Sequence, residues 1–229
     1  MPYFVPVLRL SSELPRQSAP QDKLGGLPWG LRPSLWPTCK ECGKSQSLLA
    51  QFVHDSPRLD LGRAGRVLSV FQCNHDPGMC STWEGGSGAN ACVVTQPEEM
   101  EPGLSSLPAD SPQVEREARV VEWRERDDEF PETGTGGITT STRLGGVPFW
   151  IQNPDEAPDG WRFIGQLDST YSFLIAPTVG AAGVTVDSEH WEGRSHYCEG
   201  PNFGDGGIAY LFLRNTPTAP EGWFFWQCG

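Results

Sequence analysis

Four cysteines in the first half of the chain have the number and spacing of the ligands in a closed zinc site. Cys39 and Cys42 form a Cys-x-x-Cys pair within Trp-Pro-Thr-Cys-Lys-Glu-Cys-Gly, where Pro and Gly favour a tight turn that aims two thiolates at one ion. Cys73 and Cys80 follow an apolar run that is predicted to be a strand ending at the site. Because four protein ligands leave no position for water, such a zinc ion would stabilise the fold rather than act as a catalyst.

Other uses of these thiols stay open at the level of the sequence. Disulfides are disfavoured because no secretory signal is present, and redox chemistry at a Cys-x-x-Cys pair would need a βαβ context that the sequence does not show. Buried thiols without a metal are a further alternative. His75 lies between Cys73 and Cys80 and could replace one thiolate as a ligand. The remaining cysteines are predicted to be ordinary reduced thiols: Cys92, Cys198 and Cys228.

The charge of the chain restricts its partners. Its 229 residues carry a formal net charge of −12, which disfavours nucleic acid, because binding to phosphates relies on Lys and Arg releasing counterions. A basic protein is the better electrostatic match. No apolar stretch is long enough to span a membrane, and the N-terminus has no charged region followed by an apolar one. We therefore expect a cytoplasmic protein that has no membrane partner.

The composition predicts a mainly β fold with little helix. The chain has 27 glycines and 21 prolines, and few of its windows have the periodicity of an amphipathic helix. Short apolar runs bounded by turn residues predict strands at 48–53, 67–71, 91–95, 119–123, 171–175, 207–214 and 223–227.

Three segments recur in the same order in both halves, which predicts an internally duplicated, pseudo-symmetric fold. Lys-Leu-Gly-Gly-Leu-Pro-Trp at 23–29 returns as Arg-Leu-Gly-Gly-Val-Pro-Phe-Trp at 143–150. Gly-Arg-Val-Leu-Ser-Val-Phe at 65–71 returns as Gly-Gly-Ile-Ala-Tyr-Leu-Phe at 206–212, and between them Leu-Ala-Gln-Phe returns as Ile-Gly-Gln-Leu. Since no Cys-x-x-Cys pair follows the second copy of the first segment, only the first half should bind metal.

We therefore expect two β-rich lobes whose sheets are shared or abut. The first comprises residues 1–95 with the zinc knuckle, an acidic and proline-rich linker covers 96–118, and the second lobe comprises 119–229. Residues 97–133 contain twelve acidic residues and four arginines. This stretch is either a solvated linker or a surface for a basic partner.

The Leu-Gly-Gly-x-Pro corners could be structural or functional. Adjacent glycines permit positive φ, and the proline directs an aromatic residue, Trp29 or Trp150, against a neighbour. These tryptophans either staple tight corners to the core or frame a groove that holds a partner. Gln51 and Gln166 would bond to the backbone if buried, or to an extended peptide if exposed. Asp205 is expected in a turn, with a role as a binding carboxylate as the alternative.

Taken in order, several motifs resemble the YwqG-like family of bacterial proteins. They are the repeated Leu-Gly-Gly-x-Pro, the Trp-Pro-x-Cys-x-x-Cys knuckle, Phe-Gln-Cys, Val-Val-Glu-Trp-Arg-Glu-Arg-Asp-Asp, Phe-Trp-Ile-Gln, and Phe-Gly-Asp-Gly-Gly-Ile with a closing Trp-Gln-Cys, from about Lys23 to Gly229. That family is similar to the eukaryotic programmed cell death protein two relatives, which are chaperones for a ribosomal protein. The resemblance implies a duplicated β-rich fold, zinc on the four cysteines, and a protein-binding role without established catalytic residues.

The leading hypothesis is a cytosolic, zinc-stabilised protein-binding module, chaperone-like or a toxin antagonist of the immunity type. It would hold a protein or peptide in a groove between the repeats. The alternative is an enzyme that acts on a small or peptide substrate at the same groove. Its acid/base candidates are His54, His75 and Asp205, which would have to lie close together, because no motif presents a nucleophile, a base and an orienting group.

Overall fold

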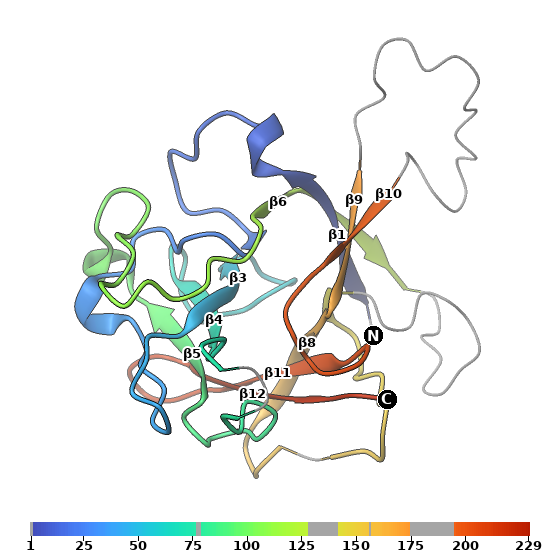
Figure 1. Cartoon of the computed structure of the whole chain (residues 1–229). Coiled ribbons are helices and arrows are strands. Elements are labelled where there is room, and N and C mark those ends of the chain that lie inside the picture. The colour runs from blue at the N-terminus through green and yellow to red at the C-terminus, as the bar shows by residue number, and fades with distance from the viewer. Residues whose placement is uncertain (1, 77–78, 128–141, 156, 175–194) are drawn as a thin grey trace.

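Most of the chain is organised as one antiparallel sheet. The computed structural model describes residues 2–76, 79–127, 142–155, 157–174 and 195–229 (Figure 1). Ten strands form the sheet, in the order β12-β11-β8-β7-β1-β6-β2-β3-β4-β5, and β9 pairs separately with β10. The strands are β1 (Tyr3–Leu10), β2 (Lys23–Leu24), β3 (Ser47–Val53), β4 (Val67–Gln72), β5 (Asn90–Thr95), β6 (Ala118–Arg126), β7 (Arg143–Gly145), β8 (Arg162–Asp168), β9 (Thr170–Leu174), β10 (Ser195–Glu199), β11 (Ile208–Arg214) and β12 (Glu221–Gln227).

The prediction of a mainly β fold is confirmed. The helices in the described parts of the chain are three short 3-10 turns, η1 (Ser11–Glu13), η2 (Pro33–Leu35) and η3 (Pro97–Glu99). No helix there is long and apolar enough to cross a membrane. Each of the seven predicted strands corresponds to an observed one, although the last residue of the run at 171–175 lies outside the described residues.

The first strand, which contains a proline, was not among the predicted strands. A proline cannot donate a hydrogen bond to a neighbouring strand and is usually confined to strand edges. Pro6 nevertheless lies in β1, opposite Trp123 of β6. The pairing of β1 with β7 covers only Tyr3 and Phe4. Beyond Phe4, β1 therefore has a ladder on one side only, and the proline is tolerated.

The sheet curls until its two edge strands meet. Its inner face forms a single core to which both halves contribute, including Phe52, Val70, Leu144, Leu211 and Phe224. The edge strands β5 and β12 pack side by side so closely that a Cβ on Gly222 would lie 2.5 Å from Cβ of Cys92. The sheet is thus nearly closed, and the core lies within it.

The two halves of the sheet have matching strand orders. On one side of the central β1–β6 pair lie β2, β3, β4 and β5, and on the other lie β7, β8, β11 and β12, in chain order outward from the centre. In the chain, β1 precedes the first set and β6 precedes the second. In the sheet, however, β1 pairs with β7 and β6 pairs with β2. The innermost strand of each half of the sheet therefore comes from the other half of the chain: β6 lies next to β2, and β1 lies next to β7.

The two Leu-Gly-Gly-x-Pro corners have the same backbone geometry. Gly25 and Gly26 have φ of 63° and 72°, and Gly145 and Gly146 have φ of 76° and 71°. Residues with a Cβ rarely adopt this left-handed conformation, and at Gly25 a Cβ would also overlap the carbonyl of Arg116. The double glycine is therefore required by the turn that leaves each short strand.

Residues 96–118 pack against the first corner. Gly30 N–H donates to Gly103 O at 2.9 Å, Ser105 N–H to Pro28 O at 2.8 Å, and Gly26 N–H to Glu115 O at 2.9 Å. The segment predicted as a linker thus lies along the corner over much of its length.

The close packing of β5 against β12 can be tested by adding one methyl group at Gly222. We expect Gly222→Ala to lower the free energy of unfolding by about 1–3 kcal/mol, because the added Cβ overpacks against Cys92. Chemical denaturation measures this change. Its matched control is Glu221→Ala in the same strand, which removes only an exposed ion pair with Arg214 and should cost less than about 1 kcal/mol. Equal stability of the two variants would contradict this close packing.

Candidate metal centre and polar groove

Two loops bring the four predicted cysteines together beside the end of the β3–β4 hairpin. The Sγ atoms of Cys39, Cys42, Cys73 and Cys80 all lie within 4.8 Å of one another. Cys42 is exposed, whereas the other three are buried. The prediction that these residues meet at one place is confirmed.

The first loop is a short hairpin. Thr38 and Ser45 form an isolated bridge, Cys39 N–H donates to Lys44 O at 2.8 Å, and Gly43 N–H donates to Cys39 O at 2.9 Å. Gly43 has φ of 72°, which the tight turn needs. The hairpin therefore fixes the positions of both thiols of the Cys-x-x-Cys pair.

The second loop is tied to the first by hydrogen bonds. Cys73 N–H donates to Ala89 O at 2.8 Å, which continues the β4–β5 pairing as far as the cysteine. The carboxylate of Glu41, between the first two cysteines, accepts from Ser81 N–H at 2.9 and 3.1 Å. Glu41 thus holds the residue after Cys80 against the first hairpin. The sequence offered no signal for this role.

Backbone hydrogen bonds also reach two of the thiols. Burial raises the pKa of Cys73 to about 11, although the N–H of His75 opposes the shift. At Cys42 burial acts in the same direction, but hydrogen bonds from the Lys44 backbone and the neighbouring thiols lower its pKa overall. Burial also raises the pKa of Cys80. The backbone of His75 therefore supports a thiol, and its exposed side chain is outside the four-cysteine group.

The geometry of this donor set fits a tetrahedral metal. Zinc–sulfur bonds of about 2.3 Å at tetrahedral angles place neighbouring sulfurs about 3.8 Å apart. The Sγ atoms of Cys42 and Cys73 are 3.5 Å apart, and the widest separation in the group is within 4.8 Å. Four thiolates are the ligands that zinc selects in structural sites. The four cysteines could therefore hold zinc after small adjustments of the thiols.

The two glutamines proposed as binding residues are fully buried. Gln51 Oε1 accepts from Trp29 N–H at 2.7 Å, and its Nε2 donates to Gln21 O at 3.0 Å. Gln166 Oε1 accepts from Phe149 N–H at 3.2 Å. Each amide thus stabilises the corner of its own half by a hydrogen bond. Because it is fully buried, it is not accessible to a peptide.

The corners that carry Trp29 and Trp150 lie at opposite ends of the sheet. Leu24, at the first corner, is level with Leu10 of β1, whereas Leu144, at the second, pairs with Phe4. Six residues of strand separate Leu10 from Phe4, or about 20 Å. Trp29 is half-buried, Trp150 packs at 4.6 Å between ring centres on Tyr210, and Asp205 is exposed in the turn before β11. The two corners therefore do not frame one groove.

The histidines considered for catalysis are also separated. His54 follows β3, and its N–H donates to Arg66 O at the start of β4. Its Nδ1 accepts from Leu61 N–H at 2.9 Å. His75 follows the opposite end of β4, so the two rings are separated by the length of that strand, about 20 Å. His54, His75 and Asp205 do not form one acid/base group.

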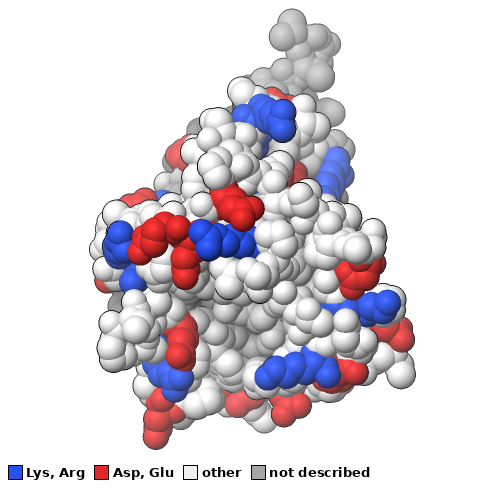
Figure 2. All heavy atoms as spheres, turned by 90° about the vertical axis from the view of Figure 1, so that its left-hand side faces the viewer, with Lys and Arg blue, Asp and Glu red and all other residues white. Residues whose placement is uncertain are grey.

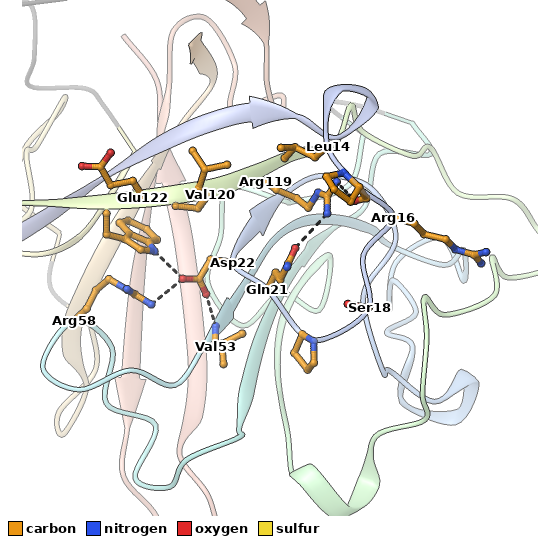
Figure 3. Close-up of a pocket in the computed structure, with 14 residues that line it drawn as sticks. Leu14, Arg16, Ser18, Gln21, Asp22, Val53, Arg58, Arg119, Val120 and Glu122 are labelled. Atoms are coloured by element: carbon orange, nitrogen blue, oxygen red, sulfur yellow. Dashed lines mark hydrogen bonds and ion pairs between the residues drawn. The ribbon is translucent and has the colours of Figure 1, made fainter. Parts of the chain in front are cut away.

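A polar groove of about 790 Å³ opens along β6, beside the segment that leads into β2 (Figure 3). One wall is the segment between residues 14 and 22, and the other consists of residues 119–123 of β6. At one end, Asp22 accepts from Val53 N–H at 2.6 Å, from Trp123 Nε1 at 2.7 Å and from Arg58 Nη2 at 2.8 Å. The Arg58 guanidinium lies 4.7 Å from the centre of the Trp123 ring. The sequence analysis missed this groove because its walls are distant in sequence.

The other end of the groove is formed by a buried arginine. Arg119 is only 6% exposed, and its guanidinium donates to Pro15 O at 2.6 Å, to Ser11 Oγ at 3.2 Å and to Gln21 Oε1 at 3.4 Å. Among the described residues, no carboxylate pairs with it. Arg16 also lines this end and is exposed.

The role of the buried amides can be tested at Gln51. We expect Gln51→Leu to lower the free energy of unfolding by about 2–4 kcal/mol, because it removes the partners of Trp29 N–H and Gln21 O and leaves no polar group at a fully buried position. Thermal or chemical denaturation measures the loss. Gln113→Leu, which changes an exposed glutamine, is the matched control. A Gln51→Leu chain as stable as this control would show that the amide does not brace the corner.

Asp22 should give the stability a specific pH dependence. Burial raises its pKa above the usual 3.8, despite the donors from Val53, Arg58 and Trp123. The folded state therefore binds this proton more tightly than the unfolded state, and the contribution of Asp22 to stability falls as pH rises through its folded pKa. Melting wild type and Asp22→Asn side by side from pH 4 to pH 7 should show wild type losing stability relative to the variant. A difference that grows in the opposite direction would contradict the raised pKa.

Comparison with known proteins adds no relative. A scan against models of protein families found no match, and a search of curated proteins found none either. The four-cysteine group and the groove on β6 therefore carry the functional argument.

Proposed function

We propose that Cys39, Cys42, Cys73 and Cys80 hold a structural zinc ion. The observation that carries this proposal is the meeting of four Sγ atoms within 4.8 Å, held by two loops that are bonded to each other through Glu41 and Ser81. All four coordination positions would be filled by the protein, so the ion would stabilise the loops and would not activate water. Metal binding would also supply folding free energy to a part of the chain that lies outside the main core.

The second element of the proposal is an internal duplication. Its support is the matching strand order on the two sides of β1–β6 and the repeated contacts at the corners. In each half a buried cation reaches across the corner to a carbonyl, Lys23 to Leu27 O and Arg143 Nη2 to Val147 O. In each half a buried glutamine also accepts the backbone N–H of the residue after the proline. A gene duplication would produce such paired contacts directly.

We propose that the chain is a non-catalytic protein-binding module of the YwqG-like type, acting in the cytoplasm. A closed ligand set, the resemblance in the sequence, and the six free thiols among the described cysteines support this proposal. The net charge of −12 favours a basic protein over nucleic acid. On the face shown in Figure 2, acidic and basic side chains lie next to one another, so the partner there would meet mixed charges. Chaperone and toxin-antagonist roles both fit stoichiometric binding without turnover.

Metal analysis tests the first element. We expect one zinc per chain after purification without added metal, and loss of that zinc in Cys39→Ser and Cys73→Ser. Cys92→Ser is the matched control, since Cys92 lies on β5 outside the group. A chelator should lower the melting temperature of the wild type but not that of a folded Cys39→Ser chain. A metal-free wild type with an unchanged melting temperature would refute the zinc centre.

Affinity capture from the native cells tests the binding role. We expect one basic protein at a fixed stoichiometry, and its binding should be reconstituted from the two purified chains. Cys92→Ser should retain this partner. Leu104 is exposed and forms a β-bridge with Trp29. Loss of the partner in Leu104→Asp would therefore show that the partner contacts the first corner. Failure of the purified pair to associate would contradict the binding-module proposal while leaving the zinc proposal intact.

A further inference from the structure

The groove on β6 contains an uncompensated positive charge. Of its three lining arginines, Arg58 is paired with Asp22 at 2.8 Å. The other lining acid, Glu122, lies 3.3 Å from Arg124. Both acids of the groove are therefore engaged, whereas among the described residues no carboxylate faces Arg16 or Arg119.

Because Arg119 is buried, its positive charge lowers the stability of the folded state. Arg119 lies directly opposite Lys23, another fully buried cation, in the pairing of β6 with β2. The carboxylate of Glu117 is 2.9 Å from Lys23 Nζ, so it compensates the lysine. Arg119 is left with neutral oxygens as acceptors. A buried charge that lacks a counter-ion is strongly destabilising, and an anion beside the guanidinium would remove that cost.

The hydrogen bonds of Arg119 leave one side of the guanidinium available. Nε donates to Ser11 Oγ, and Nη2 donates to the carbonyls of Ser11 and Pro15. Nη1 has only the long 3.4 Å contact with Gln21 Oε1. Figure 3 shows this contact as the dashed line from Arg119 to Gln21. Nη1 can therefore donate to a ligand without releasing the loop that covers β6.

The rest of the groove defines the kind of anion. Prolines, Val120 and the ring of Trp123 line it together with the charged ends, so it offers apolar surface beside the arginine. Its volume lies in the range of small-molecule sites, roughly 300–1,000 Å³. A ligand with an apolar body would cover this apolar surface, whereas inorganic phosphate would leave it exposed to water. We propose that this groove binds a carboxylate that carries an apolar body. The carboxylate would lie on Arg119, and the exposed Arg16 side chain, which points away from Arg119 in Figure 3, would turn toward it.

This site is independent of the cysteine group and of the proposed protein partner. The carboxylate could belong to a free small acid or to the C-terminus of a peptide, since both offer the same group. The two sources differ at the end of the ligand remote from the carboxylate, where only the peptide continues as a chain. A test must therefore include one ligand of each kind.

Ligand titration followed by NMR tests the proposal on the full chain. The probes are N-acetyl-leucine, a tripeptide ending in leucine with a free carboxylate, N-acetyl-leucine amide as the uncharged match, and inorganic phosphate. We expect the first or second probe to shift the Trp123 indole N–H and the Gln21 amide, and the amide probe to leave both unchanged. Arg16→Ala should weaken binding about threefold to tenfold, whereas Arg63→Ala, an exposed arginine outside the groove, should not. Binding of phosphate alone, or equal binding of the acid and its amide, would overturn the proposal.

A second variant supplies the missing anion from the protein itself. Gln21→Glu has nearly the same shape and places a carboxylate beside Arg119 Nη1. We expect it to raise the melting temperature and to abolish binding of both carboxylate probes. Asn153→Asp adds the same charge at an exposed position and is the control. A Gln21→Glu chain that binds the probes as wild type does, or that melts no higher than Asn153→Asp, would refute the site.

Discussion

The pairing of β1 with β6 is the interaction on which the rest of the structure depends. Its ladder runs from Tyr3 opposite Arg126 to Leu10 opposite Ala118 and joins the two halves of the sheet. Because β1 also pairs with β7 and β6 also pairs with β2, neither half can complete its sheet without a strand from the other end of the chain. The common core, the corners and the groove on β6 all follow from this exchange.

Buried cations are the second recurring constraint. Lys23 and Arg143 are both fully buried in the short strands β2 and β7, and each donates a hydrogen bond to a carbonyl of the turn that follows. Burial lowers the pKa of Lys23, and it lowers the pKa of Arg143 to about 9. These side chains thus hold the turns at an electrostatic cost. The turns would otherwise leave inward carbonyls without donors.

The cysteine group stands apart from this core. Cys39, Cys73 and Cys80 form a small cluster with Ala89, separate from the large cluster inside the sheet. Three buried thiols and one exposed thiol contribute little packing by themselves. Two loops of this length need another source of free energy to stay in place, and a metal ion would supply it through bonds to all four sulfurs. The groove, in contrast, is lined by β6, which is held in place by its pairing with β1.

The sequence alone determined the local features. Short apolar runs bounded by turn residues predicted seven strands, since both signals depend only on residues that are neighbours in the chain. The number and clustering of Cys39, Cys42, Cys73 and Cys80 likewise indicated one site, because four such thiols match the ligand set of a structural zinc ion. Only the tertiary structure decided where the two corners lie, that Gln51 and Gln166 face the interior, and that Arg119 is buried without a carboxylate partner among the described residues. These depend on strand order and register between segments about a hundred residues apart, which no local pattern of residue types records.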